Sequence, residues 1–146
     1  TRLSVATSAA LTGAYGLRAQ GNDANYVQYD LTTAAPVHDA RFQFRPNANK
    51  GSGQVIFQAG TTRAHSTVVY RVRYRWSGST PQVQIQVGAS TSNGTWTNLS
   101  STSTNVIEVV WQAKGSSGPA PGTLQLVVNG AVAQTLTTTS TASRRG

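Results

Sequence analysis

The segment from Val68 to Trp76, VVYRVRYRW, alternates large apolar residues with arginines. Successive side chains of a β-strand point to opposite faces, so Tyr70, Val72 and Tyr74 would share one face and the arginines the other. The apolar face is expected to build the core of a sheet. The pattern therefore predicts a half-buried strand whose outer face carries a row of positive charge.

A second segment, Asp39 to Arg45, follows the same alternation. Its predicted faces are Ala40, Phe42 and Phe44 inward, and Arg41, Gln43 and Arg45 outward. Further strands are predicted over Gln54–Ala59 with Val55 and Phe57 inward, over Gln82–Val87 with its glutamines outward, and over Val106–Ala113.

The segment GTLQLVVNGAVAQTL contains the strongest local signal in the chain. Its Asn129-Gly130 pair tolerates the positive φ angles of a type I′ turn, so two strands should meet there as a hairpin. No window shows a convincing helical period, and turn residues recur at the spacing typical of sandwiches. The prediction is an all-β, antiparallel sandwich in a single domain over residues 1–146, with a closed barrel as the alternative architecture.

Composition adds a strong charge asymmetry to this picture. Charged residues make up only 11% of the chain, yet the formal net charge is +8 and the sequence pI is about 10.9. Such a field favours anionic partners, including acidic polysaccharides, nucleic acids and lipid headgroups, without choosing among them. Cysteine is absent, which excludes disulfides and thiolate chemistry.

Membrane insertion is not expected, because no apolar run approaches the roughly 20 residues that span a bilayer. No secretory leader opens the sequence. The protein is therefore expected either to be cytosolic or to have lost a leader before Thr1.

Five segments resemble, in order and spacing, the bacterial laminin-G-like domains of the concanavalin A-like lectin and glucanase superfamily. They are LSVATSAALTGAYGLRA, YVQYD with DARFQFRPN, TVVYRVRYRW, VIEVVWQA and GTLQLVVNG. The resemblance implies an antiparallel jelly-roll sandwich of two sheets, secreted or displayed on a bacterial cell surface, and implies no activity. Members commonly have a further C-terminal strand that is not evident before Gly146. One expectation is a sandwich that lacks a terminal strand, whose exposed edge a neighbouring chain could cover. The alternative is that the ends of the chain are trimmed or disordered.

Enzymatic activity is not expected. Glucanases of this superfamily place several carboxylates along one strand, because retaining cleavage needs an acid and a nucleophile roughly 5 Å apart. Glu108 is the only glutamate and has no acidic neighbour two residues away. His38 and His65 are the only histidines, and no nucleophile elbow accompanies them. No catalytic residues are assigned.

The segment GNDANYVQYD is the one candidate for a cofactor site, which would hold calcium. Asp23 and Asp30, with Asn22 and Asn25, could supply about half of the six to eight oxygens that Ca²⁺ takes. The alternative is a polar turn rich in residues that tolerate left-handed backbone.

The arginines form a candidate binding face if the strands around Arg41, Arg71 and Gln82 are neighbours. That face would comprise Arg41, Gln43, Arg45, Gln54, Gln58, Arg71, Arg73, Arg75, Gln82, Gln84 and Gln86. Guanidinium groups suit carboxylate, sulfate or phosphate, and glutamine amides suit hydroxyls. The alternative is an ordinary solvated sheet. Specific nucleic-acid binding is not expected, because the aromatic residues alternate away from the arginines and could not stack on bases.

Two functional hypotheses follow. The first is a non-catalytic, exported module that binds a polysaccharide or another anionic surface polymer, or serves as an adhesive part of a cell surface. The second is a self-assembling structural subunit of an extracellular filament or layer, a homo-oligomer completed by strand exchange.

Overall fold

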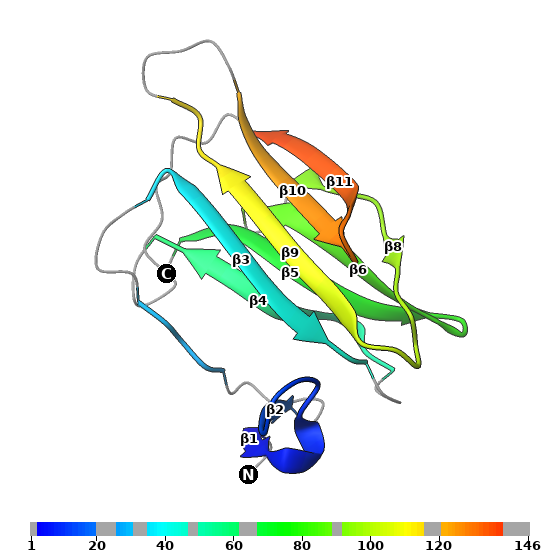
Figure 1. The fold of residues 1–146 in the computed structure, drawn as a ribbon. Helices are drawn as coiled ribbons and strands as arrows, with labels where there is room; N and C mark the ends of the chain where they lie inside the picture. Colours follow the sequence, from blue (N-terminus) through cyan, green and yellow to red (C-terminus); the bar gives the residue numbers. More distant parts are fainter. Residues whose placement is uncertain are drawn as a thin grey trace.

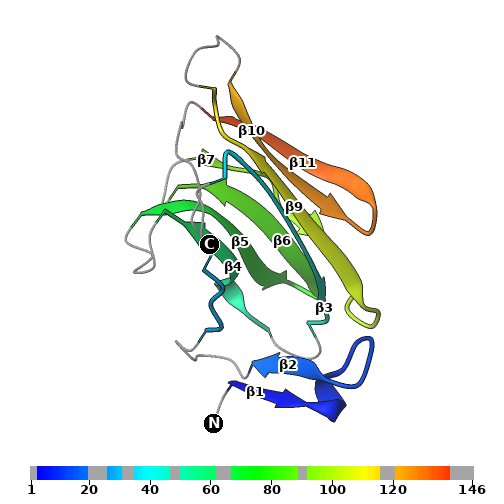
Figure 2. The same cartoon turned by 60° about the vertical axis from the view of Figure 1, so that its left-hand side comes forward.

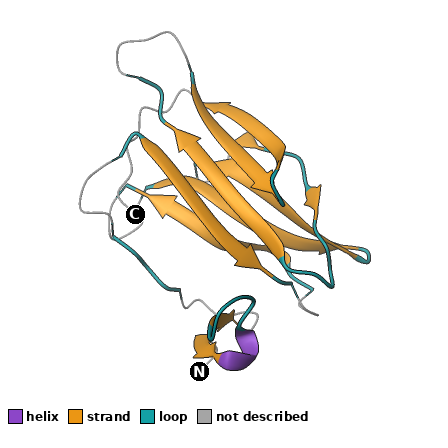
Figure 3. Cartoon of the chain, viewed as in Figure 1, coloured by secondary structure: helices purple, strands orange, loops and turns teal. Residues whose placement is uncertain are grey.

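The chain forms a β-sandwich of two antiparallel sheets (Figure 1). The computed structural model describes residues 3–19, 26–30, 35–46, 50–61, 67–88, 92–115 and 121–138. Apart from one short 3₁₀ turn, η1 (Thr7–Ala9), the regular elements in these ranges are strands (Figure 3). The predicted all-β class and sandwich are confirmed. The closed barrel is wrong for the described strands, since they form separate sheets.

One layer is a four-stranded sheet in the order β11-β10-β9-β3. Its strands are β3 (Val37–Phe44), β9 (Asn105–Gln112), β10 (Gly122–Val128) and β11 (Ala131–Thr138). The turn between β10 and β11 is the predicted one, with φ of 52° at Asn129 and 84° at Gly130. These left-handed values are the ones that an Asn-Gly pair tolerates, so the predicted hairpin is confirmed.

The other layer is a five-stranded sheet in the order β4-β5-β6-β7, with β8 also paired to β6. Its strands are β4 (Ser52–Gly60), β5 (Val68–Ser77), β6 (Thr80–Val87), β7 (Ser92–Asn93) and β8 (Thr97–Asn98). The chain thus enters the first layer with β3, builds the whole second layer, and returns with β9 to lie beside β3 (Figure 2).

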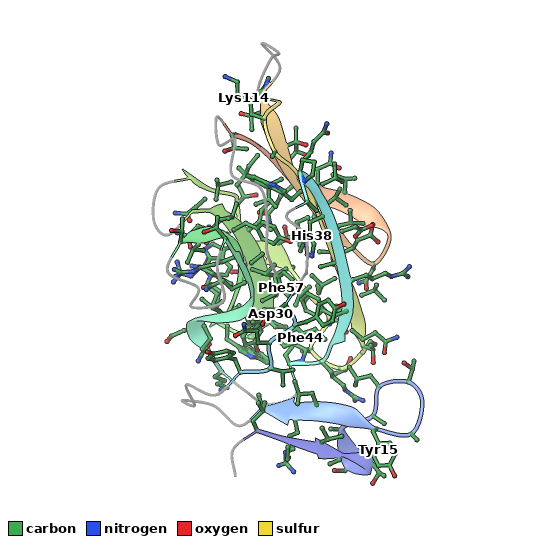
Figure 4. All side chains as sticks on the ribbon, turned by 90° about the vertical axis from the view of Figure 1, so that its left-hand side faces the viewer. Tyr15, Asp30, His38, Phe44, Phe57 and Lys114 are labelled. Carbon is green, nitrogen blue, oxygen red and sulfur yellow. The ribbon has the colours of Figure 1, made fainter. Side chains whose placement is uncertain are left out.

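The inner face of β5 lies at the centre of the core, as its alternation predicts. Tyr70 and Val72 are fully buried and Tyr74 is 2% exposed. Their partners across the layer boundary are aromatic: the ring of Tyr74 meets Phe44 of β3 edge-on at 5.1 Å between centroids. Figure 4 shows Phe44 between the two layers. The strand is central and its face assignment is confirmed.

Aromatic contacts join the layers where β3 lies over β4. Phe42 stacks on Phe57 with 5.6 Å between ring centroids, and Phe57 in turn lies 6.0 Å from Tyr70. Nδ1 of His38 lies 2.6 Å from the Tyr70 hydroxyl oxygen, so this buried hydroxyl has a polar partner. Face-offset and edge-on ring pairs of this kind stabilise a core beyond their buried area.

Gln134 of β11, a polar side chain that is 6% exposed, joins the two layers at the opposite margin of the sandwich. Its Oε1 accepts a hydrogen bond from the Ile85 amide, and its Nε2 donates to the Val83 carbonyl and to Thr97 Oγ1. Ile85 lies between the short pairings of β6 with β7 and β8, whereas Val83 pairs with Thr97 of β8. Gln134 therefore supplies the partner that the ladder lacks at the Ile85 amide.

The prediction for β4 is wrong at its beginning. The register shifts at Ser52/Gln54 and again at Val55/Phe57, so two bulges interrupt the alternation. Val55 consequently pairs with Arg73 and is 45% exposed, whereas Gln54 pairs with Tyr74. Only Phe57 of the two residues predicted inward packs against the core.

The N-terminal region forms a separate hairpin of β1 (Leu3–Ala6) and β2 (Gly16–Ala19). These strands pair with each other and with no strand of either sheet. Figures 1 and 4 show the hairpin beyond the end of the sandwich, with Tyr15 on the side away from it. Tyr15 is 67% exposed and Val5 70% exposed, so this hairpin buries little of its apolar surface.

Candidate functional site

The outer face of β5 carries three arginines, each directly opposite a glutamine of β6. The cross-strand pairs are Arg71 with Gln86, Arg73 with Gln84, and Arg75 with Gln82. Residues two apart on a strand lie on one face about 7 Å apart. The predicted row of guanidinium groups therefore exists, and it lies at the centre of the five-stranded sheet, between β4 and β6.

Each of these guanidinium groups is held at its Nε edge by a neutral oxygen. Arg71 Nε donates to Gln58 Oε1 at 2.8 Å, Arg75 Nε donates to Gln82 Oε1 at 2.9 Å, and Arg73 donates through Nε and Nη2 to the Gly53 carbonyl, both at 3.2 Å. Within the residues that the structure describes, no carboxylate partners Arg73 or Arg75. These bonds order the side chains without neutralising their charge, which is the arrangement that an anionic ligand requires.

The backbone conformation at position 53 requires a glycine. Its φ is 113°, a value that side chains rarely allow, and it is the residue skipped by the first bulge of β4. A Cβ at this position would lie 2.9 Å from Arg73 Nη2. The bulge thus allows the Gly53 carbonyl to approach the guanidinium, an example of an irregular strand beside a candidate site.

Trp96 is one of the site residues that the sequence analysis did not identify. It precedes β8, and the Arg75 guanidinium carbon lies 4.1 Å from the centroid of its ring, a cation–π contact. Beside it, Gln82 Nε2 donates to Asn98 Oδ1 at 2.8 Å. Asn98 pairs directly with Gln82, and Trp96 lies two residues earlier on the same face. Only this pairing register could have revealed the position, because the surrounding sequence is a Ser/Thr/Asn-rich stretch without alternation.

Two of the predicted ligand-binding glutamines are buried. Gln84 is 7% exposed and donates to the Gly94 carbonyl at 2.6 Å, and Gln86 is 4% exposed. Their side chains are therefore covered and cannot contact a ligand directly. Gln58 and Gln82 are half-buried and remain at the surface of the face.

The larger face predicted from the sequence does not form. Arg41 and Gln43 lie on β3, which pairs with β9 in the other sheet, and Arg45 follows directly after the end of β3. All three side chains are exposed there. Gln54 is also lost from the face, because the bulges of β4 place it opposite Tyr74. Alternation correctly predicted outward side chains, but it could not show which sheet each strand joins.

Two acidic side chains lie on the outer face of the four-stranded sheet. Glu108 lies opposite Arg41 on the outer face of the four-stranded sheet, and its neighbours two residues along the strand are Val106 and Val110. Asp39 pairs with Val110 and lies on the same outer face, as a diagonal neighbour of Glu108 across the two strands.

The calcium prediction falls mostly outside the described residues. Asn22, Asp23 and Asn25 lie outside them. Asp30 is partly buried and accepts a hydrogen bond from Gln28 Nε2. Among the described residues there is no group of three or more acidic or histidine side chains that could hold a metal ion.

Comparison of the chain with models of known families, with curated proteins and with solved structures gives no match. The resemblance to laminin-G-like domains therefore stays a prediction. In the described part of the chain, no helix has the length and apolar character needed to cross a membrane.

Proposed function

We propose that the protein is a non-catalytic module that binds an anionic surface polymer, an acidic polysaccharide, through Arg71, Arg73 and Arg75. The observation that carries this proposal is the fixing of all three guanidinium groups by neutral oxygens. Guanidinium groups that are already fixed lose less side-chain freedom when they bind an anion, so their fixing favours binding. The guanidinium N–H groups that these bonds do not use can then donate to carboxylate or sulfate oxygens.

Acidic polysaccharide fits this face better than nucleic acid does. Single-stranded nucleic acids are bound by basic grooves with several aromatic rings on which bases stack. On this face Trp96 contributes an aromatic ring, whereas the rings of Tyr70, Tyr74 and Phe57 on β5 and β4 belong to the core. Amide groups of Gln58, Gln82 and Asn98 flank the arginines and suit sugar hydroxyls.

We further propose that the sandwich is a jelly roll of the concanavalin A-like kind and that the protein is secreted or displayed at a bacterial cell surface. The return of β9 to lie beside β3, after one complete meander in the other sheet, supports such a topology. The low charged fraction of 11% and the resemblance of five segments to laminin-G-like domains support an exported protein.

The test is a binding panel with wild-type protein and an Arg71→Gln, Arg73→Gln, Arg75→Gln variant. The ligands are acidic polysaccharides, neutral β-glucan, heparin and duplex DNA, each at about 0.05 and 0.15 M salt. We expect selective binding of an acidic polysaccharide, weakened in the variant and weakened by salt. Equal binding to every polyanion would show that the arginines act only as a general positive surface. Unchanged affinity in the variant would refute the site.

The N-terminal hairpin favours a second function, self-assembly. Val5, Tyr15 and Leu17 expose apolar side chains on it, and Tyr26, Val27 and Tyr29 continue this exposed series. The outer sides of β3 and β11 are unpaired edges of the described sheet, which an extended segment of another copy could join. The test is the molar mass measured by light scattering after size-exclusion chromatography. Self-assembly requires a molar mass that rises with protein concentration, and a monomer at high concentration would exclude it.

A further inference from the structure

The outer face of the five-stranded sheet has two regions of different chemistry. Arg71 and Arg73 lean toward β4, because both donate to oxygens of that strand. Arg75 leans the opposite way, toward β6 and β8, where it donates to Gln82 and covers the Trp96 ring. We call Arg71 and Arg73 the anion subsite, and Trp96 with Arg75, Gln82 and Asn98 the ring subsite.

The ring subsite combines aromatic surface with a chain of polar groups. Arg75 donates to Gln82, which donates to Asn98, so both acceptor oxygens are used within the protein. Asn98 is exposed and its Nδ2 group donates to no described residue, while Trp96 is half-buried. A sugar ring presents an apolar C–H surface and a rim of hydroxyls, and aromatic surface flanked by amides suits both.

The two subsites are separated across the sheet. Neighbouring strands lie about 5 Å apart, so side chains anchored over β4 and over β6 are separated by about 10 Å. One sugar ring cannot reach both. A ligand that uses the whole face must therefore be a chain that crosses β5 obliquely.

We infer that the ligand is a polysaccharide in which acidic and uncharged sugars alternate. Its acidic group binds the anion subsite, and the uncharged ring next to it packs against the part of the Trp96 side chain that Arg75 does not cover. This inference rests on the proposed function, which requires only that the arginines bind an anionic polymer. It adds the prediction that the binding free energy has two contributions. The one from the anion subsite depends on salt, and the one from the ring subsite depends on the Trp96 side chain.

Calorimetric titrations separate these parts. The probes are an oligosaccharide of alternating glucuronate and N-acetylglucosamine, polyglutamate as a polyanion without rings, and oligodeoxythymidine. The proteins are wild type, Trp96→Ala, Trp96→Phe, and an Arg71→Gln, Arg73→Gln variant, each first checked for an unchanged melting temperature.

Trp96→Ala is expected to raise the Kd for the oligosaccharide by about fivefold or more, since removing ~1 kcal/mol of stacking on the ring has that effect. Its affinity for polyglutamate should change by less than about twofold, because the anion subsite is intact. Trp96→Phe should retain most of the binding. The Arg71→Gln, Arg73→Gln variant should weaken both ligands and reduce the slope of log Kd against log salt by up to about one for each arginine replaced.

The possible failures differ for the two claims. If Trp96→Ala binds the oligosaccharide as wild type does, or weakens both ligands equally, the inference is refuted while the arginine face stands. If oligodeoxythymidine is the preferred ligand and Trp96→Ala abolishes the preference, the ring subsite takes bases and the polysaccharide assignment falls. If the double arginine variant binds polyglutamate and oligosaccharide as wild type does, the proposed function itself is refuted.

Discussion

The two faces of β5 carry different kinds of side chain, although residues of the two faces alternate along the strand. Tyr70, Val72 and Tyr74 are buried against the other sheet, whereas Arg71 and Arg73 on the outer face are half-buried and bound to neutral oxygens of β4. Burial of the inner side chains lowers the free energy of the folded state, because apolar surface leaves water. The outer arginines stay at the surface, where neutral oxygens hold them in place. One strand can therefore stabilise the fold and present a binding face, and the two roles should respond to different mutations.

The largest expected effect is on the inner face. Tyr74→Ala should lower the free energy of unfolding by about 3–5 kcal/mol, because it leaves a cavity beneath Phe44. Urea denaturation measures this, with Tyr74→Phe as the control that keeps the ring. A loss below about 1 kcal/mol, the level of a surface change, would contradict the face assignment.

A polar residue of the inner face should behave as core and not as surface. Gln134→Leu removes the side-chain partner of the Ile85 amide and one bond to the carbonyl of Val83, which also pairs with Thr97. A buried group left without a partner costs about 1–3 kcal/mol, so we expect a loss of about that size. Gln125→Leu is the matched control, since Gln125 makes only an exposed bond to Thr135. Equal losses from both variants would refute the role assigned to Gln134.

On the outer face, Arg73→Gln should cost less than about 1 kcal/mol of stability, because a half-exposed side chain loses bonds that water replaces. The same denaturation series measures it. A loss comparable to that of Tyr74→Ala would show that the arginine row holds the fold together, and the division between the faces would disappear.

The smallest expected effect is on the pH dependence of stability. Burial raises the pKa of the Tyr74 hydroxyl above its ordinary value. An unfolded tyrosine ionises near pH ~10 while the folded one stays neutral, so stability is lost as the pH rises above that value. Tyr74→Phe should lose less stability between about pH 9 and 11 than wild type does, in thermal melts. Identical curves would contradict the burial of this hydroxyl.

Much of the fold could be predicted because local pattern determines it. Alternation assigned the faces of β5 and β3, and the Asn129-Gly130 pair located a turn whose φ angles few other pairs tolerate. Alternation cannot choose partner strands, which is why Arg41 was placed beside Arg71 although β3 joins the other sheet. It also fails at bulges, where one extra residue moved Val55 to the outside.

The candidate site was predictable only in part. The arginines of β5 were identified from their spacing, but their fixing depends on the Gly53 carbonyl at a bulge and on Gln82 across the hairpin. Trp96 joins them through a two-residue strand paired with β6. Such contacts come from tertiary pairing, and no periodicity in the sequence encodes them.

The central claim is that the position of the three arginines, and not the total charge of the protein, creates the binding face. Two variants with the same net charge test it: Arg71→Gln, Arg73→Gln, Arg75→Gln, and Arg18→Gln, Arg41→Gln, Arg45→Gln. The second set removes three exposed cations from the N-terminal hairpin and the β3 region. Calorimetric titration with an acidic polysaccharide at about 0.15 M salt should show the first variant weakened by at least about tenfold, and the second within about threefold of wild type. Equal weakening in both variants would contradict the account.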